Sequence, residues 1–182
     1  MKQKLALGVL ALLLTVGANL HLCRHVSVSG AEVDGSFSPD GLDRAVLTAE
    51  RTAEELLPGE AALPAYRLRY SLSLRPAEDD TAALSDALLR GTDGLCVEDA
   101  VFVNGVALGH VADGAALEEA LRVQLYAGRP SGAVNGRYTE EIALRGVYTR
   151  AGTETKMEDM LLLVGGMCPV LYTDAEGRVV LG

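Results

Sequence analysis

The spacing of hydrophobic residues changes along the chain between helical and strand-like periods. Apolar positions recur at helical spacing from Leu42 to Leu57, after a Ser38-Pro39 pair and before Pro58-Gly59. Serine is a favoured N-cap residue and proline is favoured at the first helical position. The pattern therefore predicts a long amphipathic helix over residues 39–57.

Residues 66–75 alternate with a period of two. One side carries Tyr66, Leu68, Tyr70, Leu72 and Leu74, and the other carries Arg67, Arg69, Ser71, Ser73 and Arg75. This alternation predicts a half-buried strand. We interpret its three arginines as a solvated face or as partners of nearby carboxylates, because surface charge is the common role of arginine.

The most informative stretch is a hairpin followed by a helix. Two apolar runs, within residues 95–103 and 106–111, flank Asn104-Gly105. Asn-Gly between such runs favours a type I′ turn, since both central residues need a positive φ. Asp113 then precedes a helical pattern at about 114–126 and is its predicted N-cap.

The other predicted elements are shorter. A helix is expected at about 81–90 and another at about 156–164, where Thr155 and Glu158 form a capping box and Gly165-Gly166 ends the helix. A loop is expected over 127–136, a long strand over 137–149 and a final hairpin over 169–181. The helices share one pattern of paired polar residues between apolar anchors, in Leu84–Leu88, Leu117–Leu121 and Met157–Leu161. This favours a repeated strand–helix unit, although any short amphipathic helix gives a similar pattern.

The N-terminus has the composition of a targeting segment. Lys2 and Lys4 precede an apolar run from Leu5 to Ala18, which reaches Cys23 only by including Asn19 and His21. Its length falls between a secretory signal and a membrane span, so both an uncleaved anchor and a cleaved signal stay open. Small residues for cleavage occur at 28–31. Leu20-His21-Leu22 before Cys23 is a poor match to a lipidation signal.

These observations predict an α+β fold of small antiparallel sheets and hairpins packed with short amphipathic helices, after an N-terminal membrane or signal helix. The expected organisation is a signal or anchor at 1–23, a polar linker at 24–37 and an extracytoplasmic domain at 38–182, divisible into lobes 38–94 and 95–182. In either reading of the leader, the domain lies outside the cytoplasm, anchored in the cell membrane or secreted.

Charge and cysteine content narrow the function classes. A net charge of −9 argues against nucleic acid and against docking on an anionic membrane face. The absence of tryptophan argues against a carbohydrate-stacking groove. Cys96 and Cys168 could form a disulfide in an exported protein, or could be two buried thiols. Neither belongs to a Cys-x-x-Cys pair, so zinc or redox chemistry has no support.

Several segments in order resemble a known family. They are Phe37 before an Ala-rich helix, Tyr66-Arg-Leu-Arg-Tyr, Leu84-Ser-Asp-Ala-Leu-Leu, Val101-Phe-Val-Asn-Gly-Val-Ala-Leu-Gly, Asp113 with its Leu-rich helix, and Ile142-Ala-Leu-Arg-Gly-Val-Tyr. This stretch, from about Gly35 to Glu158, resembles the non-catalytic N-terminal region of clostridial-type lysostaphin-like peptidoglycan endopeptidases, which are zinc enzymes that often carry LysM modules. The resemblance implies a bacterial cell-envelope protein.

The resemblance does not include the family's catalytic domain. That domain holds zinc through a His, an Asp and a His-x-His pair, whereas this chain has three histidines and no His-x-His. His21 and His25 border the leader, and His110 is interpreted as a solvated strand histidine rather than a ligand. Asp174-Ala-Glu-Gly177 is interpreted as a turn rather than a cation loop. The paired acidic residues fit helix starts and outer helix faces better than catalytic carboxylates.

We therefore expect a protein without catalytic residues, cofactor or metal. The predicted function is a structural or partner-binding module of the cell envelope, membrane-tethered through its N-terminal helix or secreted. The alternative is a truncated or regulatory component of a peptidoglycan endopeptidase system. A cell-wall hydrolase or another envelope protein is the expected partner, and Tyr126, Tyr138 and Tyr148 are candidate contacts, although core packing suits at least two of them.

Overall fold

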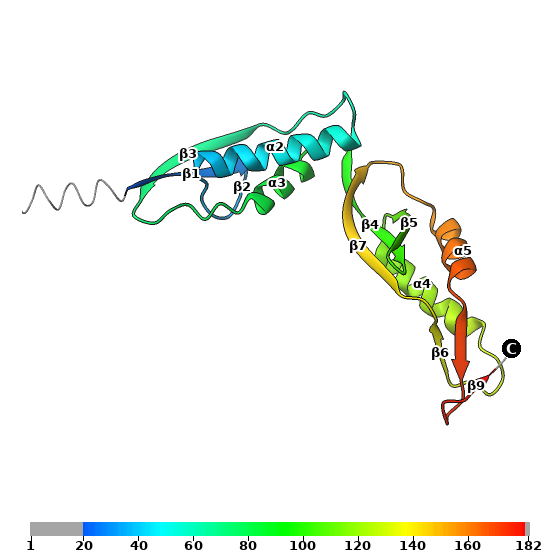
Figure 1. The fold of residues 1–182 in the computed structure, drawn as a ribbon. Helices are drawn as coiled ribbons and strands as arrows, with labels where there is room; N and C mark the ends of the chain where they lie inside the picture. Colours follow the sequence, from blue (N-terminus) through cyan, green and yellow to red (C-terminus); the bar gives the residue numbers. More distant parts are fainter. Residues whose placement is uncertain (1–19, 181–182) are drawn as a thin grey trace, which may run out of the picture. The chain divides into compact units, whose positions relative to one another are not determined.

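The computed structural model describes residues 20–180, and these form an α+β fold of helices packed with small antiparallel sheets (Figure 1). The chain divides into two compact units, with the division between Leu95 and Cys96. This position is one residue from the predicted division between lobes 38–94 and 95–182. The predicted N-terminal membrane or signal helix falls mostly on residues 1–19, which lie outside the described part.

The first unit contains a three-stranded sheet and two helices. Its elements are β1 (His21–Val28), β2 (Ala31–Glu32), α2 (Pro39–Leu56), β3 (Tyr66–Ser73) and α3 (Thr81–Arg90). The strand order is β2-β1-β3, so β1 is central and is antiparallel to both neighbours. Its core includes residues of the strands, of the helices and of the segment before α2, among them Val26, Phe37, Leu42, Ala45, Ala49, Leu84 and Leu88.

The predicted linker at 24–37 is wrong. These residues form most of β1, a tight turn, β2 and the segment leading to α2. Val26 and Phe37 are fully buried, and Phe37 pairs with Arg24 through two backbone hydrogen bonds. Ser-rich composition suggested a solvated stalk, but its alternation with valine is the period of a strand. The predicted leader boundary at residue 23 also moves, because His21 already begins β1.

Helix α2 begins where the sequence predicts, and a distant aspartate fixes its first turn. The Ser38 hydroxyl accepts a hydrogen bond from the Gly41 N–H at 3.0 Å, as an N-cap should. Asp79 accepts from the Ser38 N–H at 2.6 Å and from its hydroxyl at 2.7 Å. Gly41 is buried against this carboxylate, and a Cβ at Gly41 would overlap it. The contact ties the start of α2 to the segment before α3.

Gly41→Ala is therefore expected to destabilise the protein by about 1–3 kcal/mol, although alanine is the better helix former. The added methyl must displace the Asp79 carboxylate from Ser38. The matched control is Gly166→Ala, where an added Cβ meets open space; this variant should be neutral or stabilised by about 0.5 kcal/mol. Urea denaturation of both variants measures the difference, and equal stabilities would contradict the role of Asp79.

The second unit contains two small sheets and two helices. Its elements are β4 (Leu95–Val103), β5 (Val106–Val111), α4 (Gly114–Ala127), β6 (Asn135–Tyr138), β7 (Ile142–Arg150), α5 (Met157–Met167), β8 (Val170–Thr173) and β9 (Val179–Val180). The sheets have the orders β5-β4-β7 and β6-β8-β9. The predicted Asn-Gly hairpin is confirmed, with φ of 49° at Asn104 and 79° at Gly105.

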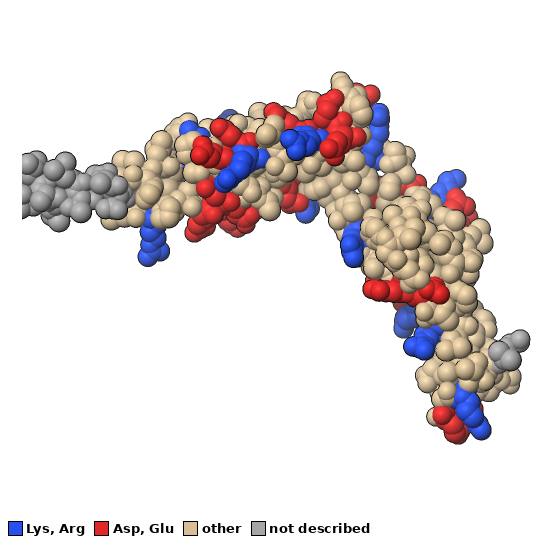
Figure 2. All heavy atoms as spheres, viewed as in Figure 1, with Lys and Arg blue, Asp and Glu red and all other residues tan. Residues whose placement is uncertain are grey.

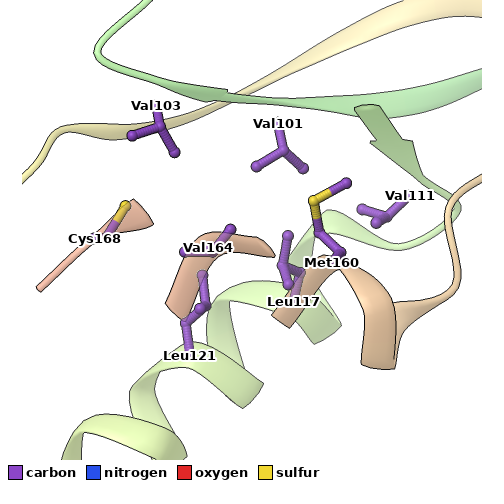
Figure 3. Packing of buried hydrophobic residues seen from close by; sticks show 8 residues of the cluster. All are labelled: Val101, Val103, Val111, Leu117, Leu121, Met160, Val164 and Cys168. Carbon is purple, nitrogen blue, oxygen red and sulfur yellow. The ribbon is translucent and has the colours of Figure 1, made fainter. Parts of the chain in front are cut away.

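One face of the β5-β4-β7 sheet packs against α4 and α5 (Figure 3). Figure 3 shows the strand valines facing the helix side chains across a single apolar layer. The layer consists of Val101, Val103, Val111, Leu117, Leu121, Met160, Val164 and Cys168, each at most 5% exposed.

Two predictions in this unit are corrected. The long strand over 137–149 is two strands, because residues 139–141 leave the strand between them. There Asn104 donates from its backbone N–H to the Glu141 carbonyl at 2.9 Å, and its side chain accepts from the Glu141 N–H at 3.1 Å. Helix α5 also continues through Gly165-Gly166 to Met167, and its N-cap Lys156 makes no side-chain cap, so the predicted capping box does not form.

The two units share part of their order of elements. Each has a hairpin, a helix, a later strand and a second helix, and in the second unit β6 lies between the helix and the later strand. In each unit the first hairpin strand is central, between its hairpin partner and the later strand. Both hairpin turns use two residues with positive φ, Ser29-Gly30 and Asn104-Gly105. The repeat is therefore larger than the strand–helix pattern that the three short helices predicted.

Candidate functional site

A group of polar side chains lies on the second unit's β5-β4-β7 sheet, on the face opposite α4 and α5. Alternation along β4 directs Val101 and Val103 to the helices, so Glu98 and Cys96 point to the other side. His110 of β5 lies opposite Ala100 in the register and so shares that side. Thr149 of β7 completes the group, which we call the Glu98 cluster (Cys96, Glu98, His110 and Thr149).

Glu98 is the centre of this cluster. One carboxylate oxygen contacts the Nδ1 of His110, and the other accepts from the Cys96 thiol at 3.1 Å. The Cys96 sulfur also lies 3.4 Å from the Thr149 hydroxyl. Only 7% of the Glu98 side chain is exposed, against 24% for His110. The carboxylate is therefore covered by its own hydrogen-bonding partners and connects three strands.

The cluster shifts the pKa of two groups. Desolvation acts most strongly on the pKa of Glu98 and raises it, but hydrogen bonds from Cys96, His110 and Thr149 together outweigh it and hold the pKa below its usual value. For Cys96, the hydrogen bond to Thr149 lowers the pKa. Burial and the negative charges of Glu98 and Glu154 outweigh that bond, so the pKa of the thiol is raised.

These shifts define what the cluster can do chemically. Glu98 is ionised at neutral pH and Cys96 is a protonated thiol. A nucleophilic cysteine needs a lowered pKa and a neighbouring base, whereas here the thiol donates to a carboxylate that raises its pKa. A carboxylate–imidazole contact of this kind can orient a histidine that acts as a base. It also gives the buried Glu98 carboxylate the hydrogen-bonding partner that burial requires. Within residues 20–180, no group of three or more His, Cys, Asp or Glu side chains is arranged to hold a metal ion.

Glu98→Gln is expected to lower the free energy of unfolding by about 1.5–3 kcal/mol at pH 7, because a charged acceptor of several hydrogen bonds is lost. The pKa of Glu98 is lowered on folding, so its contribution is present above the ordinary value of 4.5 and is lost as the pH falls below that value. Denaturant titrations of both proteins from pH 7 to pH 3 should show the gap closing. A gap independent of pH would contradict this account.

The sequence predicts a solvated His110 and does not single out Glu98. In the structure His110 is mostly buried and bonded to Glu98. A glutamate inside an otherwise apolar strand was the available signal, because such a residue must find partners when its strand is buried.

The candidate disulfide between Cys96 and Cys168 is not formed, and the chain's three cysteines are free thiols. The physical reason is their placement in the second unit. Cys168 lies 1% exposed in the helix-side layer, whereas Cys96 lies on the opposite face of the sheet. Burial raises the pKa of the Cys168 thiol. The alternative of buried thiols thus describes Cys168, and Cys96 is partly buried.

The other candidate residues have structural partners. Asp174 accepts hydrogen bonds from the N–H groups of Glu176 and Arg178, which confirms the predicted turn. Tyr138 donates its hydroxyl to the Leu121 carbonyl at 3.0 Å. Tyr148 is partly buried, and Tyr126 is exposed. Of the three tyrosines considered as contacts, Tyr126 alone is available at the surface.

Helix α5 has an apolar surface that its own unit does not cover. Met160 and Val164 lie in the core, but Leu162 is 74% exposed, and Leu163 and Met167 are also exposed. Gly166 has open space beside it. The surroundings of α5 are largely uncharged in the space-filling view (Figure 2). We call Leu162, Leu163 and Met167 the α5 face. Exposed apolar side chains that lie together mark contact surfaces, so this face is a candidate contact surface.

No protein-family model, curated protein or solved structure matches the chain. No helix within residues 20–180 combines the length and the apolar character needed to cross a membrane.

Proposed function

We propose that this protein is a non-catalytic module of the bacterial cell envelope, exported and held at the membrane by its N-terminal segment, which binds a protein partner through the α5 face. The single observation that carries the binding role is the exposure of three large apolar side chains on one short helix. Contiguous exposed apolar surface in a soluble domain marks an interaction site. The bacterial envelope assignment depends on the family resemblance.

A non-catalytic role is supported by the Glu98 cluster. Its cysteine is protonated and its carboxylate serves as a hydrogen-bond acceptor for neighbouring strands. The cluster has the composition of a reactive site, but its thiol is bonded to the acid rather than activated by the imidazole. Its geometry suits a structural role, in which side-chain hydrogen bonds link β4, β5 and β7.

The position of β1 argues against cleavage of the N-terminal segment at residues 28–31. Small residues that could serve signal cleavage occur at 28–31, and these residues form the tight turn between β1 and β2. Cleavage there would remove the central strand of the first sheet. An uncleaved anchor, or cleavage upstream of His21, leaves the sheet complete.

The expected partner is a separate cell-wall hydrolase or another envelope protein, since the chain resembles the non-catalytic region of such an enzyme. The helix contributes leucine and methionine side chains, which suit an apolar groove or a second amphipathic helix on the partner.

A photo-crosslinking amino acid at Leu162, introduced into the full chain in living cells, tests the proposal. We expect one discrete adduct, identified by mass spectrometry as an envelope protein. The matched control is the same group at Leu47, which is 55% exposed on α2 of the first unit. Adding Met167→Asp beside the probe should reduce the adduct several-fold. Equal crosslinking at Leu47 and Leu162, or no adduct at Leu162, would contradict the proposal.

A further inference from the structure

Four leucines gather at one end of the first sheet. Leu22 of β1 lies opposite Leu72 of β3 in the antiparallel register. Directly paired residues share a face, and Leu20 and Leu74 lie one step further along the same alternation. The exposed fractions are 42% for Leu20, 47% for Leu22, 68% for Leu72 and 64% for Leu74. We call these four residues the leucine platform.

The platform is the uncovered end of a face whose β1 residues are buried further along the strand. Further along the same face, Val26 and Val28 are buried in the core with residues of α2 and α3. The β1–β3 ladder continues past the start of α2, so its end receives no helix (Figure 1). The alternation of 66–75 therefore predicted the face of β3 correctly but not its burial, since Tyr66, Tyr70, Leu72 and Leu74 are exposed.

The residues beside the platform have the composition of a membrane interface. Tyr70 is 57% exposed, and the Arg24 guanidinium lies 6.0 Å from the centre of its ring. Arg75 directly follows Leu74 in the sequence. Leucine, tyrosine and arginine side chains together are typical of surfaces at the boundary between acyl chains and headgroups, where arginine extends its charge to water.

The sequence upstream of the leucine platform indicates what covers these four side chains. The apolar run from Leu5 to Ala18 ends two residues before Leu20. As a helix it would be about 21 Å long, which is shorter than the roughly 30 Å of a bilayer core. It cannot continue as a helix beyond Leu20, because His21 begins β1. A short span draws its flanking residues towards the lipid.

We propose that the leucine platform lies in the bilayer interface beside the inserted N-terminal segment and holds the first unit against the membrane surface. This inference depends on the tethering in the proposed function. Lipid covers the leucine platform, because the platform continues directly from an apolar segment of the same chain. The contact makes up for the short span and fixes one face of the β1–β3 ladder towards the membrane.

The absence of tryptophan gives a direct test. Leu72→Trp and Ser73→Trp, each in the full chain, place a single fluorophore on opposite faces of β3 at the same end. The proteins are reconstituted into phosphatidylcholine vesicles, with and without brominated acyl chains. We expect Leu72→Trp to show a blue-shifted emission that brominated lipid quenches several-fold more strongly than the emission of Ser73→Trp.

Equal, weak quenching at both positions in vesicle-bound protein would overturn the platform contact and leave the tether intact. Protein that does not float with the vesicles would instead overturn the tether, and with it this inference. A blue shift at Leu72→Trp that depends on protein concentration and resists brominated lipid would show a second copy on the platform, which also contradicts lipid contact. Circular dichroism of both variants checks that the fold is retained.

Discussion

A chain that begins at Glu32 is expected to lose the folded structure of its first unit. It lacks β1, which hydrogen-bonds to both β2 and β3 and contributes Val26 and Val28 to the core. Without this strand, β3 has no partner and the core that α2 and α3 share loses Val26 and Val28. Hydrogen exchange followed by mass spectrometry should show α2 amides exchanging at the rate of unfolded chain, a loss of several orders of magnitude in protection.

The matched control is a chain that begins at Leu20, which keeps every described element of the first unit. Its α2 amides should remain protected. Protection of α2 in the chain beginning at Glu32 would show that β1 is dispensable, and the argument for retention of the N-terminal segment would then fail.

Leu117→Ala is expected to cost about 3–4 kcal/mol of unfolding free energy. Leu117 is fully buried between α4 and the strand valines, and truncation leaves a cavity in a single apolar layer (Figure 3). Leu162→Ala is the control in the same unit. Leu162 is a leucine on a neighbouring helix but points to solvent, so its truncation should change stability by less than about 0.5 kcal/mol.

Chemical denaturation followed by the ellipticity of the helices measures both variants. A large loss in Leu162→Ala would mean that α5 packs its outer side within the protein, and the α5 face would then be unavailable to a partner. A small loss in Leu117→Ala would contradict the packing of α4 against β4.

The helices of the first unit and the central hairpin could be predicted from the sequence because local signals agree there. Ser38-Pro39 gives a cap and a fixed φ at the start of α2, and Asp80 caps α3 through the Ala83 N–H. Asn104-Gly105 supplies the two positive φ values of its turn. Each of these depends on residues within a few positions, so no tertiary information is needed.

The Glu98 cluster could not be predicted because it depends on a bulge. Regular pairing from the Asn104-Gly105 turn would set His110 opposite Asp99, on the helix side of the sheet. The register shifts between Val101 and Phe102, so His110 instead lies opposite Ala100 and shares the face of Glu98. A one-residue shift reverses the face of every later side chain.

The predictions of a linker at 24–37 and of a half-buried strand at 66–75 were wrong for a related reason. Burial depends on how far each helix extends over the sheet, and alternation alone does not give that length. One sequence signal of the larger repeat was available. Val26, Gly30 and Leu42 recur as Val101, Gly105 and Leu117 at a constant offset, in positions that prove equivalent in the two units.

Both proposals require an exported chain whose folded part begins immediately after its apolar leader. Intact mass spectrometry of the protein from membrane and medium fractions tests this directly. We expect a membrane-bound form that retains every residue from Leu20 onwards, with the leader still attached. A mature form in the medium that begins near Glu32 would contradict both the tether and the central place of β1.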